Sequence, residues 1–73
     1  MSTTRGTITL TVNGEPLVLD AGATVTDLVA RVAASPKGIA VAINADVVPR
    51  SAWPDTEVGD GDRIELLTAA QGG

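Results

Sequence analysis

The residues best suited to chemistry stand at the far end of this 73-residue chain, in the segment Ala69-Ala70-Gln71-Gly72-Gly73. Glycine has no Cβ, so a Gly-Gly end can enter a channel that is too narrow for other residue pairs. Ordering two glycines costs more backbone entropy than ordering other residues, so we expect a partner to bind them. Extended, the residues after Thr68 span roughly 16–18 Å, enough to carry the Gly73 carboxylate into another protein's active site.

The remainder of the chain is poorly equipped for catalysis. It contains no histidine and no cysteine, so the usual nucleophile–base pairs cannot be built. No GxxxxGKS/T or GxGxxG phosphate-binding motif follows a strand. Asp60 and Asp62 could form an acid–base or metal pair, but glycine-spaced aspartates more often cap a tight turn, and the calcium-loop pattern is missing. We therefore predict no catalytic residue and no metal site.

The Gly73 carboxylate is ionised at neutral pH and does not react with nucleophiles, so another protein must activate it. The chemically sensible route is an acyl-adenylate made from ATP on a separate enzyme. The adenylate gives the glycyl carbonyl a good leaving group, which an incoming sulfur or amine then displaces. The nucleotide and Mg²⁺ would belong to that enzyme, so we expect this chain to bind no cofactor itself.

Size and charge limit the other function classes. The chain is long enough for one domain, near the lower limit for a self-sufficient core. Its formal net charge is −4 and its five basic residues are scattered, which argues against a nucleic-acid partner. Residues 1–6 lack the apolar stretch of a secretion signal, and no run is long enough to cross a bilayer. We expect a cytoplasmic protein with no membrane partner.

The first strands follow from strict alternation. In residues 7–12 the threonines alternate with Ile8, Leu10 and Val12, which predicts a half-buried strand. Asn13-Gly14 is the strongest short hairpin signal, because both central residues of the favoured turn need positive φ. Residues 15–19 then form the returning strand, and Pro16 suits a sheet edge.

One amphipathic helix follows. Thr24 and Asp27 have the spacing of a capping box, with Asp in place of the usual Glu. The helix should end near Ala34, because Pro36 disfavours helical geometry at Ser35. One apolar stripe at helical spacing consists of Val25, Leu28, Val29 and Val32.

The second half of the chain predicts short strands separated by turns. Residues 39–43 form a buried strand, and in the last strand, 63–68, Ile64 and Leu66 should face inward and Leu67 outward. The intervening segments are, in order, a turn at 44–46, a brief edge strand at 47–48 blunted by Pro49, a turn or single helical turn at 51–54 and a tight turn at 59–62.

These elements predict a two-layer α+β domain in which one helix packs on a sheet of four to five strands. The last strand could join the first in parallel, which would make the sheet mixed. We place the domain at residues 1–68, with a loose lead-in at 1–6, and a flexible tail at 69–73.

Five segments, taken together and in order, carry a family resemblance: Val12-Asn13-Gly14-Glu15, Ile39-Ala40-Val41-Ala42-Ile43-Asn44, Val47-Val48-Pro49-Arg50 with Trp53, Asp60-Gly61-Asp62, and the end from Thr68 to Gly73. From Thr7 to Gly73 the chain resembles the thiamine-biosynthesis sulfur carrier (ThiS-like) family, which has a ubiquitin-like β-grasp fold. One departure is Ala45-Asp46, where the family often shows Gly-Glu; we expect a less ideal turn there.

The resemblance implies a protein co-substrate rather than an enzyme. In this family an adenylating, E1-like enzyme activates the terminal glycine, a sulfur donor system converts it to a thiocarboxylate, and thiazole synthase receives the sulfur. Carried over, Gly73 would hold the sulfur, and Gly72, Gln71 and Ala70 would pass the partner's narrow channel. A carrier with its sulfur on the C-terminus needs no thiol, which agrees with the absence of cysteine.

Three residues outside the tail have two readings each. Leu67 is either a partner-docking contact beside the tail or an ordinary exposed leucine. Trp53, the sole aromatic residue, is predicted to close the core rather than to anchor an interface. Arg50 is most simply a solvated charge, and the alternative is a contact with an acidic patch on the activating enzyme.

Three other functions remain open. A carrier resembling the small subunit of molybdopterin synthase would share the thiocarboxylate but serve another recipient. A ubiquitin-like modifier would be joined to lysines, although this chain offers only Lys37 for building polymers. A plain interaction module would bind through a sheet edge, and its Gly-Gly end would be incidental.

Overall fold

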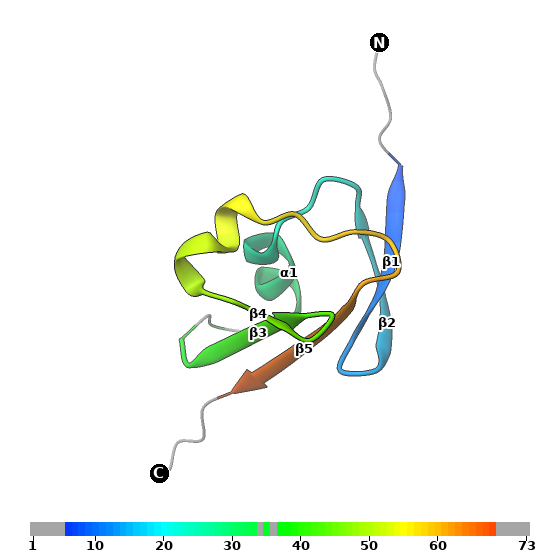
Figure 1. Cartoon of the computed structure of the whole chain (residues 1–73). Helices are drawn as coiled ribbons and strands as arrows, with labels where there is room; N and C mark the ends of the chain where they lie inside the picture. Colours follow the sequence, from blue (N-terminus) through cyan, green and yellow to red (C-terminus); the bar gives the residue numbers. More distant parts are fainter. Residues whose placement is uncertain (1–5, 34, 36, 69–73) are drawn as a thin grey trace.

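The structure is a computed structural model that describes residues 6–33, 35 and 37–68. Figure 1 shows one helix lying against a twisted sheet. The elements are, in chain order, β1 (Thr7–Val12), β2 (Glu15–Asp20), α1 (Val25–Val32), β3 (Ile39–Ile43), β4 (Asp46–Val48), the 3₁₀ helix η1 (Arg50–Asp55) and β5 (Arg63–Thr68). The predicted α+β class with one packed helix is confirmed.

The sheet has five strands in the order β2-β1-β5-β3-β4. β1 and β5 run parallel, whereas β2 pairs with β1, and β3 with both β4 and β5, in antiparallel fashion. The mixed sheet is therefore confirmed, with the last strand in its centre. Pro16 lies on the edge strand β2, where its missing N–H breaks no internal ladder.

Both hairpins turn through an asparagine with positive φ. Asn13 and Gly14 have φ values of 51° and 86°, as the predicted two-residue turn requires. The second turn uses Asn44 and Ala45, with φ values of 49° and 76°. An alanine Cβ crowds the backbone at such a φ, so this turn is strained, as the departure from the family pattern predicted.

The helix begins as predicted and ends early. The Thr24 N–H donates to Asp27 Oδ2 at 2.9 Å, and the Asp27 N–H donates to Thr24 Oγ1 at 3.3 Å, which completes the capping box. The last helical residue is Val32, not Ala34: Ala33 is already extended, with φ −129° and ψ 145°. Ala33 packs against the core in that conformation, so tertiary packing ends the helix before Pro36 can.

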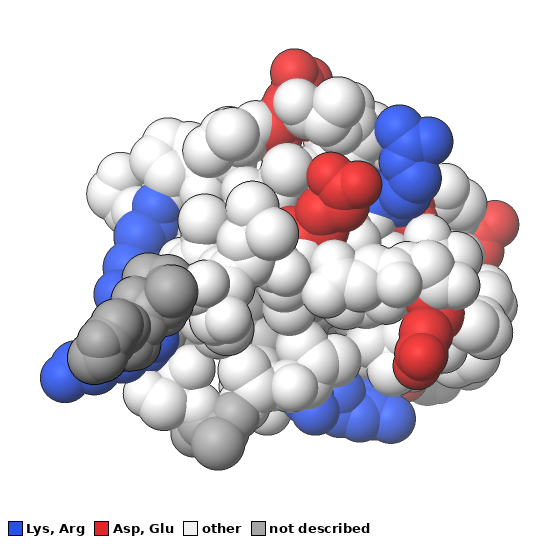
Figure 2. Space-filling view, turned by 90° about the horizontal axis from the view of Figure 1, so that it is seen from below, with Lys and Arg blue, Asp and Glu red and all other residues white. Residues whose placement is uncertain are grey.

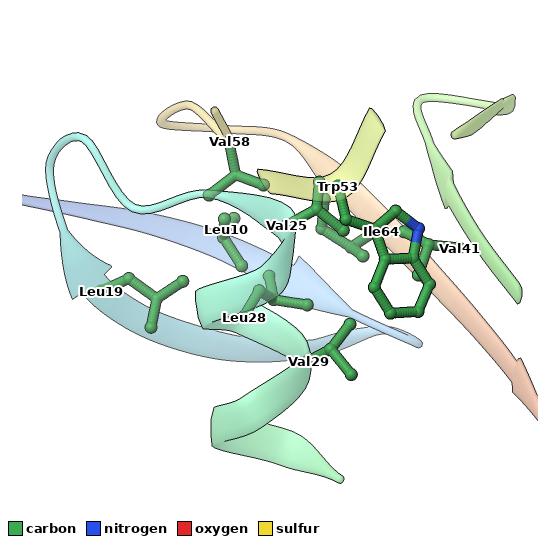
Figure 3. Close-up of a cluster of buried hydrophobic side chains, with 9 residues drawn as sticks. All are labelled: Leu10, Leu19, Val25, Leu28, Val29, Val41, Trp53, Val58 and Ile64. Carbon is green, nitrogen blue, oxygen red and sulfur yellow. The ribbon is translucent and has the colours of Figure 1, made fainter. Parts of the chain in front are cut away.

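The core lies between α1 and the sheet and is entirely apolar among the described residues. In Figure 3 its side chains point from the helix, the strands and η1 into one interior. Trp53 belongs to it, as predicted: the residue is 4% exposed, and its Nε1–H donates to the Val48 carbonyl at 3.1 Å. The buried residues are Leu10, Leu19, Val25, Leu28, Val29, Val41, Trp53, Val58 and Ile64.

Within the part of the chain that the structure describes, no helix has the length and apolar character needed to cross a membrane.

Candidate functional site

The predicted site continues directly from the central strand. Ala70, Gln71, Gly72 and Gly73 lie outside the described residues, so their predicted roles stay predictions. The structure describes the chain up to Thr68, the last residue of β5. β5 begins close to β1 and ends at the opposite end of the molecule from the start of β1 (Figure 1).

β5 is held differently on its two sides. On the β3 side the pairing runs along the whole strand, from Ile64 opposite Ile43 to Thr68 opposite Ile39. On the β1 side the register covers only Arg63 and Ile64. Beyond that point the Asn13 side chain contacts the strand: the Leu66 N–H donates to Asn13 Oδ1 at 2.9 Å, and Asn13 Nδ2 donates to the Leu66 carbonyl at 3.1 Å.

Leu67 faces outward, as the alternation in β5 predicted. It is 68% exposed, while Ile64 is buried and Leu66 is half-buried. Its cross-strand partner is the exposed Ala40 on β3.

The same face of the sheet continues into a second exposed apolar side chain. Val47 on β4 is 74% exposed and pairs with Ala42 on β3, which also pairs with Glu65 on β5. Ala40 and Ala42 thus lie between two protruding apolar side chains on the face away from the helix, and the exposed Glu65 lies on the same face beside Ala42. We call Leu67, Ala40, Ala42 and Val47 the outer-face patch.

Charge is dispersed on the surface. Figure 2 shows one face of the molecule, on which acidic and basic side chains are scattered among uncharged ones. Contact with a protein surface through this face would therefore rest on shape and apolar area more than on a single-sign field.

Arg50 is exposed, but it is not simply a solvated charge. Its guanidinium carbon lies 5.4 Å from the centroid of the Trp53 ring, within the range of a cation–π contact. The buried indole therefore holds the arginine against the surface of η1. Whether a partner contacts Arg50 stays a prediction.

Asp60 and Asp62 form a turn, not a reactive pair. Asp60 Oδ1 accepts from the Thr9 N–H at 2.8 Å, and Asp62 Oδ2 accepts from the Gly59 N–H at 2.7 Å. The carboxylates thus satisfy backbone donors. Among the described residues no group of three or more His, Cys, Asp or Glu side chains could hold a metal ion.

One surface hollow lies away from this region. It is lined by residues at the start of β1, the end of β2 and the first and last turns of α1, including Thr7, Asp20, Asp27 and Arg31. Because β1 and β5 run parallel, this hollow is at the other end of the sheet from the end of β5. It is too distant from the tail's point of departure to form part of the same site.

Sequence reasoning missed two features of this region. Val47 was expected only as part of a brief edge strand, and Asn13 only as a turn residue. The exposure of Val47 beside Ala42 depends on the register of β3 and β4, which no local pattern reveals. For Asn13 the sequence indicated a hairpin turn, but nothing near it in the sequence indicated that its side chain contacts Leu66.

Comparison with known proteins gives a consistent result. The model of the ThiS family matches residues 7–73. The sulfur carrier protein ThiS of Escherichia coli is 38% identical over 61 residues, which cover 84% of this chain and 92% of that protein. A thiazole synthase of Paramagnetospirillum magneticum is 33% identical over 64 residues, 88% of this chain, but the chain spans only 20% of that protein.

Two solved structures of a thiamine biosynthesis protein from Geobacter metallireducens are also similar. The crystal structure, of ThiS, has a TM-score of 0.77 and 36% sequence identity, covering 90% of this chain and all of that one. The solution structure has a TM-score of 0.72 and 35% identity, covering 90% of this chain and 88% of that one.

Proposed function

The chain belongs to the ThiS family, and we infer that it is a sulfur carrier protein of thiamine biosynthesis and not an enzyme. The observation that carries this inference is the similarity to the Escherichia coli sulfur carrier over 92% of that protein's length. The match to the family extends through Gly73 and so includes the Gly-Gly end. The absence of cysteine and histidine leaves the tail as the place for the chemistry.

The proposed chemistry takes place on the carboxylate of Gly73. A carboxylate oxygen attacks the α-phosphorus of ATP and releases pyrophosphate, which leaves a glycyl adenylate. A sulfide-level sulfur from the donor system then attacks the glycyl carbonyl and displaces AMP, so that a C–S bond replaces the C–O bond to AMP and the thiocarboxylate is formed. The adenylating enzyme supplies ATP and Mg²⁺ and neutralises the phosphate charge, while this chain supplies the acyl group.

Thiazole synthase is the proposed recipient. The Paramagnetospirillum magneticum protein named thiazole synthase contains a segment similar to this chain within one polypeptide. A carrier-like segment joined to the enzyme supports the idea that carriers of this kind work beside it, since linkage raises the effective concentration of the two reactants. We place the exchange in the cytoplasm, where ATP is available for the activation.

The outer-face patch is the proposed docking surface for both partners. Leu67 stands at the end of the strand from which the tail continues, and its side chain is exposed. Contact of a partner with Leu67 and Val47 buries apolar surface and so contributes binding free energy while the tail enters the partner's channel. Arg50, held over Trp53, is the proposed polar contact at the rim.

Intact-mass measurement tests the function. The chain is incubated with ATP, Mg²⁺, a thiamine-pathway adenylating enzyme and a sulfur donor. The expected product carries one sulfur in place of one oxygen at the C-terminus. A ubiquitin-like modifier would instead form an isopeptide-linked adduct, and an interaction module would keep its mass; either result contradicts the proposal.

An extended variant supplies the control. One bulky residue added after Gly73 leaves the folded body unchanged, but Gly73 then no longer carries the free carboxylate that is adenylated, and the added side chain blocks a narrow channel. We expect a normal circular dichroism spectrum and no adenylation. The recipient is tested last: the loaded chain should pass its sulfur to thiazole synthase and not to the large subunit of molybdopterin synthase.

A further inference from the structure

Two asparagines occupy equivalent places in the two hairpins and bind the two ends of the same strand. Asn13 and Asn44 are each the first residue of a two-residue turn, with φ values of 51° and 49°. Asn44 Oδ1 accepts from the Arg63 N–H at 2.9 Å, so this side chain holds the start of β5. The Asn13 side chain binds Leu66 and so holds the second half of the strand, two residues before its last residue.

Asn13 extends the parallel ladder past the point where β1 turns away. Its backbone N–H donates to the Ile64 carbonyl at 2.9 Å. Its side-chain amide then pairs with both the N–H and the C=O of Leu66, at 2.9 and 3.1 Å. A donor and an acceptor at this spacing reproduce what a further peptide unit of β1 would offer.

This contact lies two residues before the last residue of β5. Backbone groups of successive strand residues point to alternate sides, so Ile64, Leu66 and Thr68 face the β1 side. Leu66 is held by Asn13, and Thr68 is the next residue on that side and the last of the strand. The Asn13 amide therefore fixes the last part of β5 that the β1–β2 hairpin can reach.

We propose that Asn13 is a positioning residue for sulfur loading: its side-chain amide fixes the end of β5 and thereby the direction in which the tail leaves the sheet. The proposal rests on the proposed function of Gly73. Without the amide, only β3 holds the end of β5. The residues of β5 that lose this contact gain conformational freedom. They must lose that freedom again when the tail enters a partner's channel, and the entropy cost weakens binding.

The matched pair Asn13→Gly and Asn44→Gly tests it. Both variants keep a residue that tolerates positive φ, and both remove one side-chain amide that binds β5. Conversion of the Gly73 carboxylate to the thiocarboxylate is measured by intact mass at a temperature at which both variants are fully folded. The KM of the adenylating enzyme for the Asn13→Gly chain should be roughly fivefold to tenfold higher than for the unmodified chain, as expected for two lost hydrogen bonds. The kcat of that enzyme should be unchanged. The KM of Asn44→Gly should stay within about twofold of the unmodified chain.

Equal KM values for the two variants would overturn the proposal, because they would show that the Asn13 contact at Leu66 matters no more than the Asn44 contact at the start of β5.

Amide hydrogen exchange on the isolated chain separates this inference from the proposed function. Asn13→Gly should lose protection at the Leu66 amide, whereas Asn44→Gly should lose it at Arg63 and keep it at Leu66. If the unmodified chain cannot be loaded, the proposed function fails, and the exchange data still decide whether Asn13 holds the end of β5. Unchanged protection of Leu66 in Asn13→Gly would overturn the inference outright.

Discussion

Leu67→Ala should weaken partner binding without weakening the fold. Complete removal of the leucine branch from water is worth about 2.4 kcal/mol at about 0.8 kcal/mol per CH₂ group. Leu67 exposes 68% of its surface in the free chain, so that fraction is available to a partner. The variant should therefore lose about 1.5 kcal/mol of binding free energy, or about tenfold in Kd. The free energy of unfolding should change by no more than about 0.5 kcal/mol, because the side chain is largely solvated.

The assay is isothermal titration of the chain into the adenylating enzyme and, separately, into thiazole synthase. Val18→Ala is the matched control. Val18 is 50% exposed, but it lies on the edge strand β2, which β1 separates from β5. Its truncation also removes an exposed apolar branch, so it reports any general effect of surface hydrophobicity. We expect the Kd of this variant to stay within about twofold of the unmodified chain.

Two results would refute the docking argument. One is an unchanged Kd for Leu67→Ala with both partners while urea unfolding shows an intact fold. The other is an equal loss of affinity in Val18→Ala, which would mean that exposed apolar area anywhere on the sheet serves binding. In either case the outer-face patch would have no special role.

Three further changes test the body that carries the tail. Trp53→Ala should lower the free energy of unfolding by about 3–5 kcal/mol, measured by urea denaturation; a loss below about 1 kcal/mol would contradict its place in the core. Ala45→Gly should raise the unfolding free energy by about 0.5–1 kcal/mol, since φ is 76° there, and a thermal melt that does not shift upward would argue against strain. Thr24→Ala removes the capping box and should lower the free energy of unfolding by about 0.5–2 kcal/mol. Thr24→Ser keeps the capping hydroxyl and should keep most of that free energy, which comparison of the two denaturation midpoints tests.

The local sequence pattern was sufficient to predict the strands, because each strand has one solvent-exposed face and one buried face. In β1 the burial of Leu10 beside the exposed Thr9 follows the alternation in the sequence. The capping box at Thr24 and the positive φ at Asn13 are likewise decided within a few residues. The end of α1 was wrong by two residues because packing of Ala33 against the core, and not the chain's own propensity, ends the helix.

The side-chain contacts that hold β5 could not be predicted in the same way, because they join residues that are distant in sequence. The Asn13–Leu66 hydrogen bonds join residues 53 positions apart, and the Asn44–Arg63 bond joins residues 19 apart. A hairpin signal explains why asparagine is at these positions, and it is silent on where the side chains point. Only the strand order, with β5 between β1 and β3, brings both turns to the same strand.

The central place of β5 has a mechanical consequence for a carrier. A strand at the edge of a sheet has a neighbour on one side only, so its end can tilt without breaking many contacts. β5 instead has β3 along its whole length, β1 at its start and the Asn13 amide near its end. The chain direction at Thr68 is therefore set by both halves of the domain. Leu67, which belongs to the outer-face patch that we propose as the docking surface, lies one residue before Thr68 on this supported strand. The edge strands β2 and β4 each lack a neighbouring strand on one side and so lack this two-sided support.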